Sequence, residues 1–192
     1  GDPGYASGDG RVSVYFGRSD ILPRSTLNYS LPIEPPDPRT GDGGGATNDF
    51  GSVAAADVNN DGRADLLVNA VNTGAGGRVY VYLGNASRRV TTPPLVLRGS
   101  SGVQTFGHGF SGVGDVNRDG YEDVVVGTAH PSNRAFLFLG NSTGILTNFS
   151  TSIASPDADV VPNFGHTLAG AGDVDGDGFT DVVIPAPHIL NA

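Results

Sequence analysis

The chain has 192 residues, of which 38% are hydrophobic and 16% are charged, and it contains no cysteine. This length is sufficient for one domain with its own core. The formal net charge of −9 makes nucleic acid and anionic membrane surfaces poor partners. No apolar run reaches the roughly 18 residues of a membrane-spanning helix, so we expect no such span.

Short runs rich in Val, Leu and Phe, bounded by Gly, Asn and Pro, predict many short strands. The first strand is expected within "SGDGRVSVYFG" at 7–17. The Pro-, Gly- and Asp-rich stretch at 33–49 is then expected to be a long surface loop. A functional loop is the alternative for this stretch, because binding residues concentrate on loops.

The rest of the chain follows a repeated unit. "DVNNDGRAD" at 57–65 returns as "DVNRDGYED" at 115–123 and as "DVDGDGFTD" at 173–181, with a period of 58 residues. Each nonapeptide follows a Phe-Gly pair and a small-residue strand, and each precedes a buried-type strand. An alternating strand (77–84 or 133–140) and a weaker fourth strand follow. Four short strands per repeat predict an all-β fold of four-stranded antiparallel blades, a β-propeller.

The position of the chain ends within the repeated unit divides the chain into whole blades and half blades. The first strand matches the third strand of a unit, and "GFTDVVIPAP" at 178–187 matches the second. We therefore expect one propeller segment over 1–192, made of a half blade with the Pro/Gly-rich loop (1–49), two blades (50–105 and 106–163) and a half blade (164–192). About three blade-equivalents are too few to close a ring of four to eight. We expect the chain to be part of a larger propeller; pairing of the two half blades is the alternative.

Each nonapeptide offers the ligands that a hard cation prefers. Side-chain oxygens stand at positions 1, 3, 5 and 9, a backbone carbonyl at position 7 and a turn-forming Gly at position 6, and Ca²⁺ takes about six to eight oxygens. We predict three Ca²⁺ sites, formed by Asp57, Asn59, Asp61, Arg63 (carbonyl) and Asp65; by Asp115, Asn117, Asp119, Tyr121 (carbonyl) and Asp123; and by Asp173, Asp175, Asp177, Phe179 (carbonyl) and Asp181.

The nonapeptides have two other interpretations, an EF-hand and a set of turns without metal. An EF-hand needs Glu at position 12, but that position is Val68, Val126 or Ile184, each in a strand-like run. Asn/Asp-Gly turns without metal are the remaining alternative. The predicted ligand positions hold ten of the twenty acidic residues, so bound Ca²⁺ would offset a repulsion that otherwise opens each loop.

The motif order resembles the FG-GAP repeat. That order is Phe-Gly, a small-residue strand, Asp-x-[Asn/Asp]-x-Asp-Gly-x-x-Asp, and then "VVVGTAHP" or "VVIPAP", and three such motifs cover residues 50–187. The resemblance implies the β-propeller of integrin α subunits. It also implies an extracellular or cell-surface setting, because the repeat occurs in other secreted and surface proteins, including phospholipase-like ones.

Four glycosylation sequons support a secreted chain. They begin at Asn28, Asn85, Asn141 and Asn148, whereas chance would give roughly two in a chain of this composition.

No catalytic constellation is evident, and we expect no enzyme activity. The four histidines, His108, His130, His166 and His188, recur with the repeat, which favours a structural or surface role. The function we expect is a calcium-stabilised, non-catalytic propeller that binds a protein or glycan partner in cell adhesion or in surface or matrix assembly. An accessory propeller of a secreted hydrolase such as a phospholipase, and a lectin-like glycan-binding propeller, are the alternatives.

Overall fold

The computed structural model describes residues 12–15, 30–33, 51–71, 76–87, 90, 93–129, 131–156 and 163–187. Within these residues the secondary structure consists of strands and turns without helix, as the all-β prediction requires. Across the same part of the chain, no helix has the length and apolar character that a membrane span needs. Phe50, Asn28, His130, His188 and nearly all of the loop at 33–49 lie outside the described residues.

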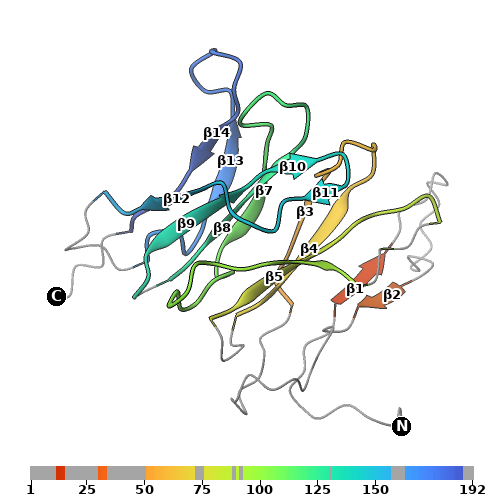
Figure 1. The fold of residues 1–192 in the computed structure, drawn as a ribbon, viewed down its shortest axis with the longest axis horizontal. Helices are drawn as coiled ribbons and strands as arrows, with labels where there is room; N and C mark the ends of the chain where they lie inside the picture. The colour runs from red at the N-terminus through yellow and green to blue at the C-terminus, as the bar shows by residue number, and fades with distance from the viewer. Residues whose placement is uncertain are drawn as a thin grey trace, which may run out of the picture.

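The strands that pair within each sheet are antiparallel (Figure 1). Their bounds are β1 (Val12–Tyr15), β2 (Ser30–Ile33), β3 (Val53–Ala56), β4 (Asp65–Ala70), β5 (Arg78–Tyr82), β6 (Leu95–Leu97), β7 (Phe110–Gly114), β8 (Asp123–Gly127), β9 (Arg134–Phe138), β10 (Gly140–Asn141), β11 (Gly144–Ile145), β12 (Thr151–Ala154), β13 (Ala169–Gly172) and β14 (Asp181–Val183).

Two four-stranded antiparallel sheets form the middle of the molecule. One has the order β3-β4-β5-β6, and the other the order β7-β8-β9-β12, each in chain order. These are the predicted propeller blades. A small hairpin, β10–β11, lies between the third and fourth strands of the second sheet and was not anticipated from the sequence.

The two-stranded sheets β1–β2 and β13–β14 lie at opposite ends of the molecule (Figure 1). In the part of the chain that the structure describes, they do not pair with each other. β13 packs beside β7. β3 packs beside β7 and β1 packs on β4 and β5, so that, apart from the β10–β11 hairpin, the sheets are stacked in chain order.

The main core lies between the two four-stranded sheets. Side chains alternate between the faces of a strand, so Leu67 on β4 and Val79 and Val81 on β5 face the second sheet, where they meet Val124 and Phe136. The opposite face of each four-stranded sheet packs against a further core. In the first sheet, Val68 and Tyr82 face β1. In the second sheet, Val125 faces β13–β14. Burial on both faces explains the nearly uninterrupted apolar runs of β4 and β8.

The Phe-Gly pairs position each blade on its neighbour. Phe106 and Phe164 are buried, and Phe106 makes edge-to-face contacts with Phe136 and Phe138. Gly165 comes so close to β8 that a Cβ placed on Gly127 would overlap the carbonyl oxygen of Gly165. Because Gly127 has no Cβ, the backbones of the second blade and the following one can approach each other closely.

Candidate cation-binding loops

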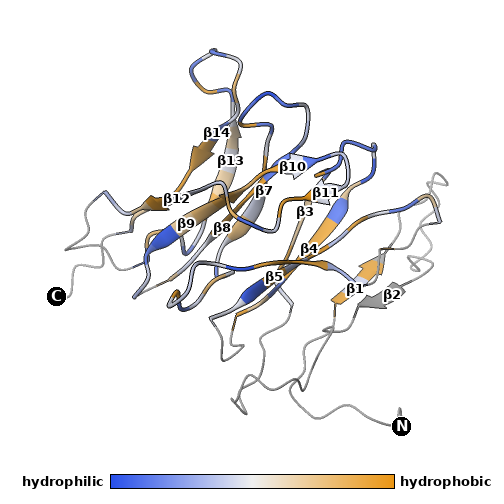
Figure 2. Cartoon of the chain, in the orientation of Figure 1, coloured by the Kyte–Doolittle hydropathy of each residue, from blue (hydrophilic) through white to orange (hydrophobic). Residues whose placement is uncertain are grey.

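The three acidic nonapeptides connect the first two strands of their sheets. They join β3 to β4, β7 to β8 and β13 to β14, and they project from the same edge of the molecule (Figure 1). Figure 2 shows this edge as mainly hydrophilic, in contrast to the apolar strands below it. We name them loop 1 (57–65), loop 2 (115–123) and loop 3 (173–181).

Side chains at positions 1, 3 and 5 fold inward onto the backbone of their own loop. In loop 1, Asp57 accepts hydrogen bonds from the amides of Asp61 (3.0 Å) and Gly62 (2.8 Å), Asn59 accepts one from Asp61 (3.3 Å), and Asp61 accepts one from Arg63 (3.0 Å). Such side-chain-to-backbone bonds are the reason that Asp and Asn favour turns. They gather the oxygen atoms of alternate residues on one side of the loop.

Loops 2 and 3 repeat this network. In loop 2, Asp115 accepts from the amides of Asp119 (3.1 Å) and Gly120 (2.7 Å), and Asp119 accepts from Tyr121 (3.0 Å). In loop 3, Asp173 accepts from the amides of Gly178 and Gly176 (both 2.8 Å), Asp175 accepts from Asp177 (3.1 Å) and Asp177 accepts from Phe179 (2.8 Å). The bond from position 6 to position 1 recurs in all three loops, whereas the second amide bound to position 1 is that of position 5 in loops 1 and 2 and that of position 4 in loop 3.

The Gly at position 6 has the backbone conformation that the sequence predicts. Gly62, Gly120 and Gly178 have φ values of 79°, 90° and 87°, a region that residues with a Cβ adopt only with strain. Position 4 is also left-handed in all three loops, where Asn60, Arg118 and Gly176 have φ values of 51°, 61° and 79°. Asn tolerates this region well, whereas Arg is uncommon there.

Loop 3 has the densest group of carboxylates. Oxygen atoms of Asp173, Asp175 and Asp177 lie within 4.8 Å of one another, and all three side chains are exposed. Loops 1 and 2 have Asn59 and Asn117 at the position of Asp175. Because like charges so close repel, loop 3 has the greatest need of a compensating cation.

The Asp at position 9 lies beneath its loop. Asp65 is completely buried and accepts hydrogen bonds from the amides of Val58 (3.0 Å) and Gly84 (2.8 Å). Asp123 is equally buried and accepts from Val116 (3.0 Å) and Gly140 (2.9 Å). In loop 3, Asp181 accepts from Val174 (2.8 Å) and is only half-buried. This residue ties the start of each loop to the sheet, a role that the ligand prediction did not include.

Burial raises the pKa of Asp65 to about 6 and also raises the pKa of Asp123. The hydrogen bonds from backbone amides oppose this increase, and the carboxylates at positions 1 and 5 of the same loop add to it. The ionised forms are thus disfavoured by their surroundings, and a positive charge nearby would reverse that preference.

The donor set fits a hard cation. Every predicted side-chain ligand is a carboxylate or an amide oxygen, and neither sulfur nor imidazole is among them. Oxygen-only sets suit Ca²⁺ and Mg²⁺ rather than zinc or copper. The fold brings positions 1, 3 and 5 together at the loop centre and places position 9 at its base.

Two residues outside the predicted ligand set connect neighbouring loops. Glu122, at position 8 of loop 2, accepts a hydrogen bond of 2.6 Å from the amide of Asp57 in loop 1. Arg118, at position 4 of loop 2, donates from Nε to the carbonyl of Gly178 in loop 3 at 2.7 Å. Sequence reasoning missed both. The available signal was that position 4 carries Arg in one loop but Asn or Gly in the others.

The described histidines lie away from these loops. His108 and His166 each follow a Phe-Gly pair, so they precede the strands at whose far ends the acidic loops begin. Both are exposed, and their ring centroids are 4.6 Å apart. This agrees with the surface role expected for them.

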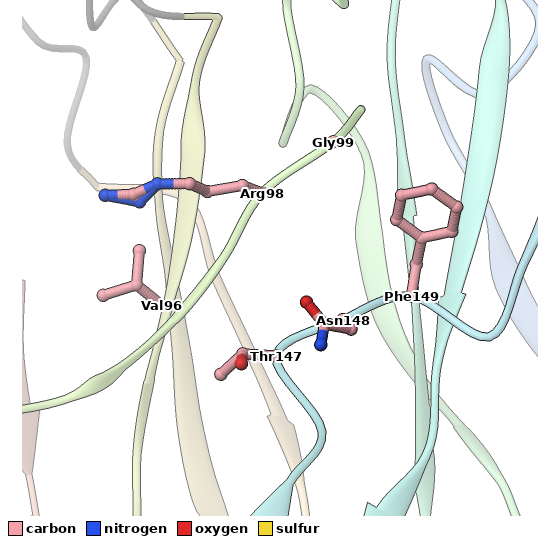
Figure 3. A pocket seen from close by; sticks show the side chains of 6 residues that line it. All are labelled: Val96, Arg98, Gly99, Thr147, Asn148 and Phe149. Carbon is pink, nitrogen blue, oxygen red and sulfur yellow. The ribbon is translucent and has the colours of Figure 1, made fainter. Parts of the chain in front are cut away.

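One shallow pocket of about 420 Å³ lies between the end of β6 and the segment before β12. It is lined by Val96, Arg98, Gly99, Thr147, Asn148 and Phe149. Figure 3 shows the guanidinium of Arg98 extending away from Asn148 and Phe149, so the polar groups do not converge on one point. The pocket has neither a nucleophile nor an acid–base pair among its lining residues.

Comparison with known proteins agrees with the repeat. The model of the FG-GAP-like repeat matches residues 115–184, and that of the FG-GAP repeat matches residues 50–82. Integrin alpha-PS5 of Drosophila melanogaster is 36% identical over 146 residues, covering 71% of this chain and 14% of the relative. Integrin alpha-IIb of Mus musculus is 37% identical over 149 residues (70% and 14%), and human Integrin alpha-6 is 32% identical over 150 residues (74% and 13%). The chain spans about one seventh of the length of these curated relatives.

Proposed function

The chain is an integrin-like FG-GAP repeat β-propeller, and from this premise we propose that its three acidic loops bind Ca²⁺ and that its blades mediate protein–protein interaction outside the cell. The observation that supports this most strongly is that the bond from the Gly at position 6 to the Asp at position 1 recurs in all three loops, with oxygen atoms at every predicted ligand position. Turns without metal would not require this number of carboxylates.

The residues that would hold the cation are those predicted from the sequence. Positions 1, 3, 5 and 9 of each loop supply side-chain oxygens and position 7 supplies its carbonyl. When bound, Ca²⁺ supplies positive charge that offsets the mutual repulsion of the carboxylates. The loop residues orient those oxygens through their amide hydrogen bonds, and Asp65 and Asp123 attach the loops to the sheets. The role we assign to the cation is structural.

A larger propeller is part of the proposal. Position 2 of the loops is Val58, Val116 and Val174; Val58 is fully buried against the next blade, whereas Val174 is 71% exposed. Val183 on β14 is exposed as well. In the first blade, the equivalent positions are covered by the neighbouring blade. The exposed apolar side chains in loop 3 and β14 therefore support a further blade beside β13–β14.

The exposure of two glycosylation sequons supports the extracellular setting that we propose. Asn85 and Asn148 are exposed, so an oligosaccharide could be attached without disturbing the core. Asn141 is half-buried, and its side-chain oxygen accepts hydrogen bonds from the hydroxyl (2.6 Å) and the amide (2.8 Å) of Thr143. We expect Asn85 and Asn148 to be the more readily modified of these three.

The similarity to integrin α subunits favours adhesion-type protein interaction over catalysis. The interaction would be tested with cells that display the full chain on their surface. Attachment of these cells to a protein-coated matrix in Ca²⁺, and their release by EDTA, would support it. Equal attachment by cells that lack the chain would contradict it.

The calcium proposal is tested by thermal unfolding of the full chain in Ca²⁺ and in EDTA. We expect Ca²⁺ to raise the melting temperature, and Asp119→Ala in loop 2 to reduce that rise. Asp159→Ala removes the same charge outside the loops and serves as the matched control. If EDTA leaves the melting temperature of the unmodified chain unchanged, the calcium assignment is wrong.

A further inference from the structure

Arg118 occupies a backbone conformation that its side chain does not favour. Its φ of 61° lies in the left-handed region, where Asn60 stands at the same position of loop 1 and Gly176 at that of loop 3. A non-Gly residue held there is strained, and the strain points to a contact that compensates for it. The contact is found on the neighbouring loop.

The side chain of Arg118 crosses from loop 2 to loop 3. Its Nε donates to the carbonyl of Gly178 at 2.7 Å, and another guanidinium nitrogen donates to the carbonyl of Asp177. The guanidinium carbon lies 3.8 Å from the centre of the Phe179 ring. One side chain thus contacts positions 5, 6 and 7 of loop 3, combining a forked hydrogen bond with a cation–π contact.

These contacts lie next to predicted ligands in both loops. In loop 2, Arg118 lies between Asn117 and Asp119. In loop 3, Asp177 and Phe179 supply a predicted side-chain and a predicted carbonyl ligand. A backbone bond of 3.4 Å from Thr180 to the carbonyl of Asp115 joins the same two loops. Displacement of either loop would therefore displace ligands of the other.

We propose that Arg118 couples the cation sites of loops 2 and 3, so that an intact site in loop 3 strengthens cation binding in loop 2, and the reverse. The inference rests on the proposed calcium binding. Reciprocity follows from thermodynamic linkage, and coupling between binding sites is typically about 5-fold or more in affinity. Arg118 acts as a positioning residue, because its side chain orients the backbone of loop 3.

The chain contains a reporter for loop 2. Tb³⁺ replaces Ca²⁺ in oxygen-ligand sites and emits when a nearby tyrosine is excited. Position 7 is Tyr121 in loop 2 but Arg63 and Phe179 in loops 1 and 3. The part of the emission that is lost in Tyr121→Phe therefore reports occupancy of loop 2.

The test is a double-mutant cycle on the Tb³⁺ midpoint of loop 2. Asp173→Ala disables loop 3 and should weaken Tb³⁺ binding at loop 2 about 5-fold or more while Arg118 is present. In the R118N background, Asp173→Ala should have little effect on Tb³⁺ binding at loop 2, because the contact of Arg118 with loop 3 is already lost. R118N places the residue of loop 1 at this position and relieves the backbone strain, so the variant should fold.

Arg63→Asn is the matched control, because it removes an equal charge from loop 1. The guanidinium of Arg63 contacts Asp61 of its own loop, donating to the carbonyl at 3.2 Å and lying 3.4 Å from the carboxylate. In this variant the effect of Asp173→Ala on loop 2 should be retained. Hydrogen exchange in EDTA supplies a readout without metal: amides at 176–179 should exchange faster in R118N than in R63N.

The outcomes separate the two proposals. Absence of Ca²⁺-displaceable Tb³⁺ emission from the unmodified chain would overturn the proposed calcium binding at loop 2, and with it the coupling. Normal emission with an equal effect of Asp173→Ala in the R118N and unmodified chains would overturn the coupling alone. If the amides at 176–179 exchange hydrogen at the same rate in R118N as in R63N, Arg118 does not order loop 3. This result would also overturn the coupling.

Discussion

The side-chain nitrogen of Asn69 donates a hydrogen bond of 3.0 Å to the carbonyl of Gly107, which lies 38 residues further along the chain in the next blade. The side-chain oxygen of Asn69 accepts from the amide of Ser52 at 3.0 Å, and the residue is 2% exposed. One buried amide thus joins two strands of its own blade to the Phe-Gly turn of the following one.

Replacing Asn69 by Ala should destabilise the chain by about 1–3 kcal/mol, because a buried donor and a buried acceptor lose their partner. Chemical denaturation would measure the loss. Gln104→Ala removes a comparable amide from an exposed position and should change the stability little. Equal stabilities of the two variants would show that the link between the blades is unimportant.

Gly127→Ala should also be destabilising, by about 1–3 kcal/mol or more, because the added Cβ would overlap the carbonyl oxygen of Gly165 in the next blade. Backbone atoms packed between two sheets cannot move aside as a side chain can. The control is Gly99→Ala, whose Cβ would meet side-chain atoms of Phe106 and Val103 at 3.0 Å. Calorimetry of both variants should show the larger decrease in melting temperature for Gly127→Ala.

Asp175→Asn gives loop 3 the ligand pattern of loops 1 and 2. The substitution should stabilise the loop without a cation and weaken its binding of the cation. In EDTA the melting temperature should rise, because one of three close carboxylates loses its charge. In titrations of the full chain, the affinity of loop 3 for Ca²⁺ should fall about tenfold, since one full charge beside a divalent ion is lost.

Titration calorimetry and unfolding in EDTA would measure the two effects of Asp175→Asn separately. The amide oxygen of Asn can still accept the hydrogen bond from Asp177 that Asp175 accepts at 3.1 Å, so the loop geometry should persist. A variant that is less stable than the unmodified chain in EDTA would contradict the idea that repulsion governs the empty loop.

Stability should fall at alkaline pH through Tyr82. Burial raises the pKa of Tyr82 to about 12, with a smaller contribution from Tyr80, whereas the pKa in the unfolded chain is about 10. Between these values the unfolded chain binds fewer protons than the folded one, so the stabilising effect present below pH 10 is lost as the pH rises toward 12. Unfolding measured across this range should show the decrease.

Tyr82→Phe is the control for the alkaline effect, because phenylalanine keeps the ring in the core next to Val68 but cannot ionise. The variant should lose stability less steeply between pH 10 and 12 than the unmodified chain. If both chains show the same slope, the alkaline transition arises from other groups.

Local chemistry explains how much could be predicted from the sequence. Alternating apolar residues, Gly turns and Asx-type loops depend on neighbours a few residues away, so the strands, the blade pattern and the inward-facing oxygens of loops 1 to 3 follow from the repeat. The left-handed φ of Gly62, Gly120 and Gly178 was predictable for the same reason. Calcium at these loops remains a prediction that rests on that local geometry.

Only the tertiary structure reveals what joins one repeat to the next. The contacts of Asn69 with Gly107, of Glu122 with Asp57 and of Arg118 with Gly178 span 38, 65 and 60 residues. No periodic pattern specifies them, because each is made by a residue that the other repeats do not share. The burial of Asp65 and Asp123 does recur in two repeats, but it too depends on tertiary structure, because the residue that follows the third strand closes over the loop base. These unshared contacts arise only when the sheets stack, since stacking brings distant residues within hydrogen-bonding distance.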